Sequence, residues 1–315
     1  MRNEGQSIRA IAERLGRSPN SISYELRKNN VSTHYDPTKA DRKAQLRRKD
    51  AKYQGMKIAE HEELKKYVDT HLLDDKSPES IAGRLQKHVH HLPYASKDSI
   101  RRYIRSVHGR KTAWHRIQQR KKRKRSTRRT KVTKLKDRRF IDTRPHYIQE
   151  RRYIGDAEAD FVVSGKTGKG ILLTLTCRKI RVSFLEQIIK VTIANVHRAF
   201  QVIQKRFPEL ASISIDNDVL MQKHQELEKL LGIKIYFCHP YHSWEKGTIE
   251  NTNKYVRKDI PKGSDISKYS KREIRKLEAK LNRRYMKVLS YQTPQEMLDQ
   301  HRKRKQRLRA VKKSH

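Results

Sequence analysis

After residue 152, strand-forming and helix-forming segments alternate in an order that few folds accommodate. Residues 153–163, 170–177 and 181–189 are rich in apolar and β-branched side chains and are joined by short turns, which predicts three antiparallel strands and hence a mixed α/β domain. The pattern then alternates between the helical and the extended period. We expect a helix at 193–207, a strand that ends at Asp216, a helix at 219–231, a strand at 234–238 and a helix that begins near Trp244.

This order of elements is typical of an α/β domain of the RNase H-like (retroviral integrase) type. In such a domain the first and fourth strands are neighbours, and the helix after the fifth strand packs across them. Asp160, Asp216 and Glu250 lie on these three elements, so we expect their carboxylates to meet at one end of the sheet. Carboxylate oxygens are the ligands that Mg²⁺ prefers, and two such ions about 4 Å apart can serve phosphoryl transfer. The pattern therefore predicts a site for two Mg²⁺ ions, which Mn²⁺ can replace.

Other carboxylates near these positions compete for the same roles. Asp156 and Glu158 precede Asp160 on the first strand, and Glu158 shares a face with Asp160 because side chains alternate along a strand. Asp218 follows Asp216 by two residues, and we prefer Asp216 because it directly ends the apolar strand. An Asp at the end of a strand is commonly a turn or cap residue, so position alone leaves these alternatives open.

Residues 5–30 have the pattern of a helix-turn-helix unit. Ile8, Ile11 and Ala12 recur at helical spacing, Gly16 suits the turn, and Ser18-Pro19 is typical of an N-cap and first turn. The unit begins so close to Met1 that we expect a preceding helix to be shortened or absent. A helix pair without DNA contacts is the alternative, whereas DNA recognition would use the second helix. The predicted DNA contacts are Ser18, Asn20, Ser21, Tyr24 and Arg27.

Residues 61–108 resemble a second helix-turn-helix unit. The segment from Glu62 to Leu73 is amphipathic, and Ser77 and Ser96 each precede a helical pattern as N-caps. The last of these helices directs its arginines away from its apolar stripe, as a surface that grips phosphates would, although an ordinary solvated face has the same pattern. The predicted DNA contacts of this unit are Arg101, Arg102 and Arg105.

The charge of the chain restricts its partners. Lys and Arg number 76 against 34 Asp and Glu, for a formal net charge of +42, which favours a polyanion. No apolar run approaches the roughly 20 residues of a membrane span, so we expect an intracellular protein that binds nucleic acid and no membrane. Residues 109–142 form a basic linker that we expect to be flexible and to grip phosphates. Cys177 and Cys238 form no Cys-x-x-Cys pair, so we expect two buried thiols.

Four segments together carry a specific family resemblance. Residues 239–267 read HPYHSWEKGTIENTNKYVRKDIPKGSDIS, and residues 281–298 read LNRRYMKVLSYQTPQEML. Together with IGDAEADF and SIDND, they closely resemble the insertion sequence 30 family of bacterial transposases. The resemblance covers residues 143–298, and the helical N-terminal layout agrees with it.

The resemblance implies that Asp160, Asp216 and Glu250 form the catalytic triad, with 33 residues between the last two. Arg257 lies about two helical turns after Glu250, where it could hold a DNA phosphate. Asn253 is likewise expected at the DNA. Further residues implied in DNA or water contacts, or in packing of the loop, are Asn251, Tyr241, His242 and Trp244.

Three segments depart from the family pattern. The first carboxylate segment reads Asp-Ala-Glu-Ala-Asp at 156–160, where the family commonly has His-Trp-Glu-Gly-Asp. Asp218 stands where Gly is usual, and Ile249 stands where Asn is usual. The three carboxylates are retained, so we expect catalytic activity.

The sequence therefore predicts a transposase of the bacterial cytoplasm, associated with the nucleoid. It would bind terminal inverted repeats and target DNA as a homo-oligomer, and catalyse metal-dependent strand cleavage and strand transfer. The alternatives are a regulator that only binds DNA and a nuclease of the same fold. The predicted domains are a helix-turn-helix unit at 1–35, a charged linker at 36–60, a second helix-turn-helix unit at 61–108, a basic linker at 109–142, the catalytic domain at 143–270 and a basic helical tail at 271–315.

Overall fold

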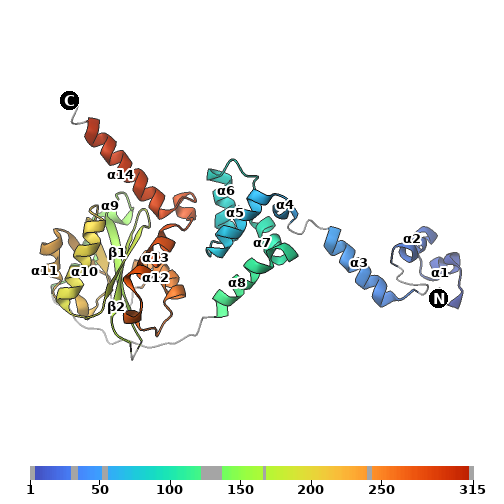
Figure 1. Cartoon of the computed structure of the whole chain (residues 1–315), viewed down its shortest axis with the longest axis horizontal. Helices are drawn as coiled ribbons and strands as arrows, with labels where there is room; N and C mark the ends of the chain where they lie inside the picture. The colour runs from blue at the N-terminus through green and yellow to red at the C-terminus, as the bar shows by residue number, and fades with distance from the viewer. Residues whose placement is uncertain are drawn as a thin grey trace.

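The computed structural model describes residues 4–29, 35–51, 56–121, 137–165, 168–239 and 243–311, which form two helical parts followed by a sheet domain (Figure 1). Much of the predicted basic linker, residues 122–136, lies outside the described residues, as do Tyr241, His242 and the side chain of Trp244. Within the described ranges, no helix is both long enough and apolar enough to cross a membrane.

The first part is a helix-turn-helix pair of α1 (Ile8–Arg14) and α2 (Pro19–Asn29), as the sequence predicts. Gly16 in the turn has a φ of +57°, a conformation that glycine adopts without strain. The backbone N–H of Ser21 donates to Oγ of Ser18 at 3.2 Å, which confirms the predicted N-cap.

The predicted charged linker at 36–60 is mostly helical. It contains α3 (Pro37–Ala51), in which Arg47 donates to the carbonyl oxygen of Lys28 at 2.7 Å and so ties the helix to α2. It also contains α4 (Met56–Ala59), whose Ile58 is fully buried in the next helical part. The second part therefore begins earlier than predicted.

The second helical part confirms the three helices that the capping patterns predict, α5 (Glu62–Leu73), α6 (Pro78–His88) and α7 (Lys97–Arg105). Oγ of Ser77 and Oγ of Ser96 each accept a backbone N–H of the first helical turn at 3.1 Å. The apolar sides of the helices share one core, in which Tyr103 is fully buried and donates its hydroxyl to the Asp69 carboxylate at 2.9 Å.

The expectation of a flexible linker from residue 109 onward is wrong for residues 110–121. After η2 (Val107–Gly109), this stretch forms α8 (Arg110–Lys121), which packs against α5 and α7. A Cβ on Gly109 would lie 2.2 Å from the Tyr103 carbonyl oxygen, so only glycine allows this close approach. Arg116 donates to the carbonyl oxygen of Lys76 at 3.2 Å. Because α8 has little apolar periodicity, these tertiary contacts hold it in place.

The sheet has the strand order β3-β2-β1-β4-β5, which confirms the RNase H-like prediction. Its first three strands are antiparallel, and β4 and β5 run parallel to β1. All residues of β2 are buried, because helices cover both faces of the sheet. The strands are β1 (Asp156–Val163), β2 (Ile171–Cys177), β3 (Ser183–Ile188), β4 (Ser212–Ile215) and β5 (Lys234–Phe237).

Figure 1 shows α10 (Ile193–Arg206) and α11 (His224–Leu231) on one side of the sheet, and α12 (Gly247–Asp259) and α13 (Lys271–Asn282) on the other. Residues of β1, β2 and β3 contribute to two separate cores, one under α10 and α11 and the other under α12 and α13, because side chains alternate along a strand. The core residues of β4 and β5 all lie under α10 and α11. Cys177 and Cys238 are buried free thiols, as predicted. Short elements complete the domain: η3 (Ile141–Thr143), α9 (His146–Gln149), η4 (Val219–Met221), η5 (Ser243–Lys246), η6 (Ile266–Lys268) and η7 (Lys287–Leu289).

Helix α13 belongs to the sheet domain and not to the predicted tail. Leu277 and Leu281 of α13 are buried in the core beside α12. The backbone N–H of Leu185 donates to Oε2 of Glu278 at 2.6 Å, and the Asn282 amide bonds to both backbone groups of Ser183 at 2.8 Å. The last helix, α14 (Pro294–Val311), also begins in the domain, with Leu298 buried, before its later residues become exposed.

Candidate active site

Strand β1 carries three acidic residues on the face that α12 covers. Asp156, Glu158 and Asp160 share this face because side chains alternate along the strand. The backbone N–H of Ile249 donates to Oε2 of Glu158 at 2.9 Å, and Nδ2 of Asn253 donates to Oδ2 of Asp160 at 2.7 Å. These bonds hold α12 against the row of carboxylates.

The first two carboxylates of the row are buried and occupied by internal partners. Oγ of Ser212 donates to Oδ1 of Asp156 at 2.5 Å, and Nε of Arg178 lies 3.2 Å from Oε1 of Glu158. Burial raises the pKa of Asp156, and the contacts with Ser212 and Arg178 only partly oppose this. Asp160 differs because 31% of its side chain is exposed, which makes it the accessible carboxylate of the strand.

Asp216 lies directly after β4, beside β1, and shares a cation with Asp160. Nζ of Lys246 is 2.8 Å from Oδ2 of Asp216 and 3.8 Å from Oδ1 of Asp160. Lys246 is the last residue of η5, immediately before α12. The parallel pairing of β1 with β4 thus brings together two carboxylates that are far apart in the sequence, as predicted.

The pKa values of this group reflect burial and opposite charges. Burial raises the pKa of Asp160, although the charge of Lys246 works against that rise. Burial alone would lower the pKa of Lys246, but attraction to Asp160 and the hydrogen bond to Asp216 outweigh it and raise the pKa. Lys246 therefore remains charged and compensates both carboxylates. The sequence interpretation missed this residue; its only signal is a lysine directly before the helix that carries Glu250.

Asp218, the competing carboxylate after β4, has a local structural role. Its Oδ1 accepts the backbone N–H of Leu220 at 2.9 Å and so caps the 3₁₀ turn η4. This turn and α11 replace the continuous helix that was predicted at 219–231, because the chain bends between Met221 and His224.

Glu250 is in the first turn of α12 but does not join the two aspartates. Its Oε1 lies 3.0 Å from Nζ of Lys254, one turn further along the helix, and half of its side chain is exposed. Among the described residues, no three His, Cys, Asp or Glu side chains stand close enough together to hold a metal ion. The Glu250 carboxylate lies along the exposed surface of α12 beside Lys254.

Asn253 and Arg257, the other residues predicted on α12, both lie near Asp160. Asn253 bonds to Asp160 and accepts the hydroxyl of Thr174 at 3.0 Å. Arg257 donates to the carbonyl oxygen of Val163 at 3.3 Å. Burial lowers the pKa of Arg257, while the charge of Asp160 acts in the opposite direction.

The other side chains predicted to contact DNA lie on two exposed helical surfaces. On the first part they occupy α2 and its N-cap, where Tyr24 is 56% exposed and Ser18 also caps the helix. On the second part they occupy α7, where Arg101 forms an ion pair with Asp98 at 3.2 Å. The exposed predicted residues are Ser18, Asn20, Ser21, Tyr24, Arg27, Arg101, Arg102 and Arg105.

Known proteins match the first helical part and, in other cases, almost the whole chain. Residues 1–29 match a family model described as a helix-turn-helix domain. The chain is 33% identical over 300 residues to a transposase for insertion sequence element IS4351 from Bacteroides fragilis, a match that covers 93% of this chain and 90% of that protein. It is 30% identical over 313 residues to transposase InsI for insertion sequence element IS30A from Escherichia coli K12, covering 93% and 79%.

Among solved structures, the catalytic core domain of BIV integrase aligns with 48% of this chain and 97% of its own length. The TM-score is 0.37 and the sequence identity is 15%.

Proposed function

Because this chain belongs to the insertion sequence 30 family of transposases, we propose that it cuts and joins DNA at the ends of a mobile element through Asp160, Asp216 and Glu250. The observation that carries the residue assignment is the shared cation of the two aspartates. Lys246 contacts both carboxylates, which come from neighbouring strands at one end of the sheet. A divalent cation in a protein is commonly held by several carboxylate oxygens, and these two carboxylates already lie around one positive charge.

The oxygen donors present suit Mg²⁺, and we propose two Mg²⁺ ions, with Mn²⁺ as a substitute. Asp160 and Asp216 would hold the ions, together with Glu250 once its carboxylate leaves Lys254. Glu250 lies one residue after Ile249 and one turn before Asn253, both of which contact the β1 carboxylates. When bound, the ions supply positive charge that activates the attacking oxygen and stabilises the leaving oxygen.

The residues around the triad would position it and hold DNA. Asn253 holds the Asp160 carboxylate through its amide, and Arg257 would bind a phosphate close to the reacting one. In the first step, water attacks a phosphodiester, a new P–O bond forms and the bond to the 3′-oxygen breaks. In the second step, the freed 3′-hydroxyl attacks another phosphodiester and displaces its 3′-oxygen. Neither step needs a covalent enzyme intermediate.

DNA recognition would fall to the helical parts. We propose that α2 and α7 read the terminal inverted repeats, that the basic linker grips the backbone, and that a homo-oligomer brings two element ends together. The packing favours a division into residues 4–51, residues 56–121 and a catalytic domain that extends from residue 137 to the start of α14. These events would take place on the nucleoid in the bacterial cytoplasm.

Cleavage and strand-transfer assays on DNA that carries the flanking inverted repeats would test the proposal. With Mg²⁺, wild-type protein should give joined products, and Glu250→Gln should bind the DNA equally well but give none. Asp218→Asn is the matched control, because Asp218 caps η4 and should be dispensable for chemistry. Nicks without joined strands would indicate a nuclease, and binding without reaction would indicate a regulator.

A further inference from the structure

The second helical part is docked against the catalytic domain. Arg84 of α6 makes two hydrogen bonds to the Glu296 carboxylate, at 2.8 and 2.5 Å, and Lys280 of α13 donates to Asp75 at 2.9 Å. A Cβ on Gly83 would lie 2.3 Å from the ring of Tyr291. Only glycine therefore allows α6 to approach the catalytic domain this closely.

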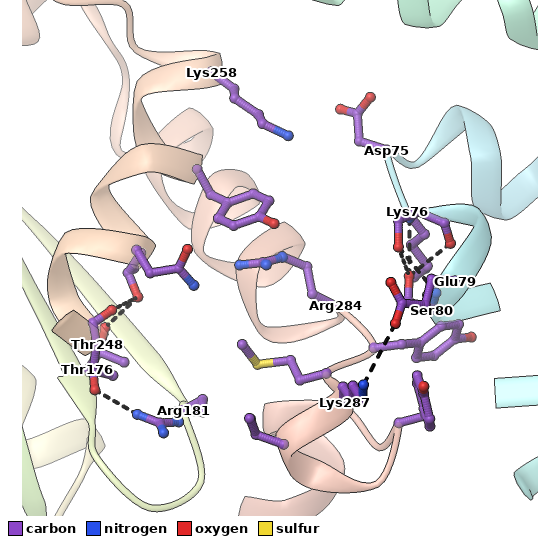
Figure 2. Close-up of a pocket in the computed structure, with 18 of the residues that line it drawn as sticks. Asp75, Lys76, Glu79, Ser80, Thr176, Arg181, Thr248, Lys258, Arg284 and Lys287 are labelled. Carbon is purple, nitrogen blue, oxygen red and sulfur yellow. Dashed lines mark hydrogen bonds and ion pairs between the residues drawn. The ribbon is translucent and has the colours of Figure 1, made fainter. Parts of the chain in front are cut away.

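Beside this contact lies a groove with a volume of about 600 Å³. Figure 2 shows Lys258 and Arg284 on the catalytic side of the groove and Lys76, Glu79 and Ser80 on the opposite side. Helix α12, which carries Glu250, forms one of its walls.

The groove is strongly basic. Among the described residues that line it, seven are Lys or Arg and two are Asp or Glu. Both acids already face lysines, since Asp75 bonds to Lys280 and Glu79 lies 3.9 Å from Nζ of Lys287. On another wall, burial and the nearby charge of Arg151 lower the pKa of Arg181 to about 10. An anion in the groove would relieve this concentration of positive charge.

Aromatic rings are interleaved with these cations. The guanidinium of Arg284 lies 3.1 Å, and Nζ of Lys258 4.5 Å, from the ring centre of Tyr255. Tyr285 and Tyr291 line the same groove. Basic side chains that follow a backbone, combined with rings on which bases stack, are characteristic of sites for single-stranded nucleic acid.

The groove adjoins the candidate active site around the surface of α12. Asn251 lines the groove and follows Glu250 directly, so the two side chains are about 100° apart around the helix. Lys254 is exposed and lies close to Glu250. A strand that leaves the carboxylates can therefore pass Lys254 and enter the groove toward Tyr255 and Lys258.

We propose that this groove binds an unpaired DNA strand next to the active site, with Lys258 and Lys287 at its phosphates and its bases toward the tyrosines that line the groove. The proposal rests on the proposed function, because the strand would be the one released or held open during cutting and joining. The two lysines come from different walls, α12 and η7, so they would grip successive parts of the backbone.

Binding of fluorescein-labelled oligodeoxythymidylate to the full-length protein, measured by anisotropy, tests the groove. Lys258→Gln/Lys287→Gln should weaken binding about tenfold and make the salt dependence shallower by about 1.4 in log–log slope. The matched control is Lys205→Gln/Lys229→Gln, which removes the same charge from exposed positions on α10 and α11. Equal losses in both variants, or an equal loss of affinity for a duplex of the same length, would overturn the proposal.

Photocrosslinking of the wild-type protein provides an independent test that needs no variant. An oligodeoxynucleotide carrying 5-iododeoxyuridine should crosslink to a tyrosine that lines the groove, Tyr255, Tyr285 or Tyr291, identified by mass spectrometry of the peptide. Crosslinks confined to α2 and α7 would overturn the proposal. Both tests measure binding and not catalysis. If the wild-type protein gives joined products in the strand-transfer assay but Lys258→Gln/Lys287→Gln binds the oligonucleotide as the wild type does, the proposal for the groove is refuted and the proposed function stands.

Discussion

Replacing Lys246 by Gln should strengthen divalent metal binding in the absence of DNA. In the structure, the Lys246 ammonium stands where a cation would bind between Asp160 and Asp216, so a metal ion has to displace it. Gln keeps much of the side-chain length and removes the charge. The two aspartates then keep their positions on β1 and after β4 but lose the internal cation that competes with the metal.

The size of the effect follows from the two distances. With an effective dielectric constant of 20, unit charges at the 2.8 Å separation from Asp216 attract by about 6 kcal/mol, and those at the 3.8 Å separation from Asp160 by about 4 kcal/mol. Half of the Asp216 side chain is exposed, and the lysine is desolvated, so the net contribution falls to about 1.4–2.8 kcal/mol. That range corresponds to metal binding that is about tenfold to 100-fold tighter.

Titration with Mn²⁺, in which electron paramagnetic resonance reports the free ion, measures this affinity without DNA or catalysis. Lys246→Arg should bind Mn²⁺ nearly as weakly as the wild type, because the charge remains. Lys258→Gln is the control for the general loss of one positive charge, because Lys258 faces the groove and not the two aspartates. An unchanged or weaker affinity in Lys246→Gln, or an equal gain in Lys258→Gln, would refute the reasoning.

Three further predictions concern the frame around the site. Leu277→Ala should lower the free energy of unfolding by about 2–5 kcal/mol in denaturant titrations, because Leu277 is buried under α12. The control, Leu308→Ala on the exposed end of α14, should change it by less than about 0.5 kcal/mol. Similar losses in both variants would contradict the assignment of α13 to the catalytic core. Gly109→Ala should increase proteolysis within α8, because the new Cβ would meet the Tyr103 carbonyl oxygen. Gly247→Ala is the control, because its Cβ would meet open space and neither glycine has a positive φ. Unchanged cleavage of α8 would argue against the close contact at Gly109. Arg84→Ala should separate the thermal unfolding of the helical part and the catalytic domain. Burial would raise the pKa of Glu296, but its bonds to Arg84 outweigh burial and lower the pKa below 4.5. The ion pair between Arg84 and Glu296 is therefore complete above pH 4.5 and weakens as the pH falls through the lowered pKa. A single unchanged calorimetric transition in Arg84→Ala would count against the coupling of the two parts.

Local signals in the chain were reliable where the partner atoms lie within a few residues. Ser77 and Ser96 cap α6 and α7 as predicted, because an N-cap bonds to a backbone N–H only three residues away. Strand alternation likewise predicted the shared face of Glu158 and Asp160. The same local reasoning failed for α8. Its weak apolar pattern does not indicate a helix, and the helix is held by its packing against α5 and α7.

The sequence by itself determined the order of the strands in the sheet domain, the caps, and the choice of carboxylates that could meet, since periodicity and capping are properties of short segments. Only the tertiary structure decided which carboxylates do meet and which cation lies between them. The pairing of β1 with β4 brings Asp160 and Asp216 together, Ser212 and Arg178 engage Asp156 and Glu158, and Glu250 pairs with Lys254 at the surface of α12. The groove beside α12 exists because the second helical part packs against the catalytic domain, and no local pattern in either part encodes that contact.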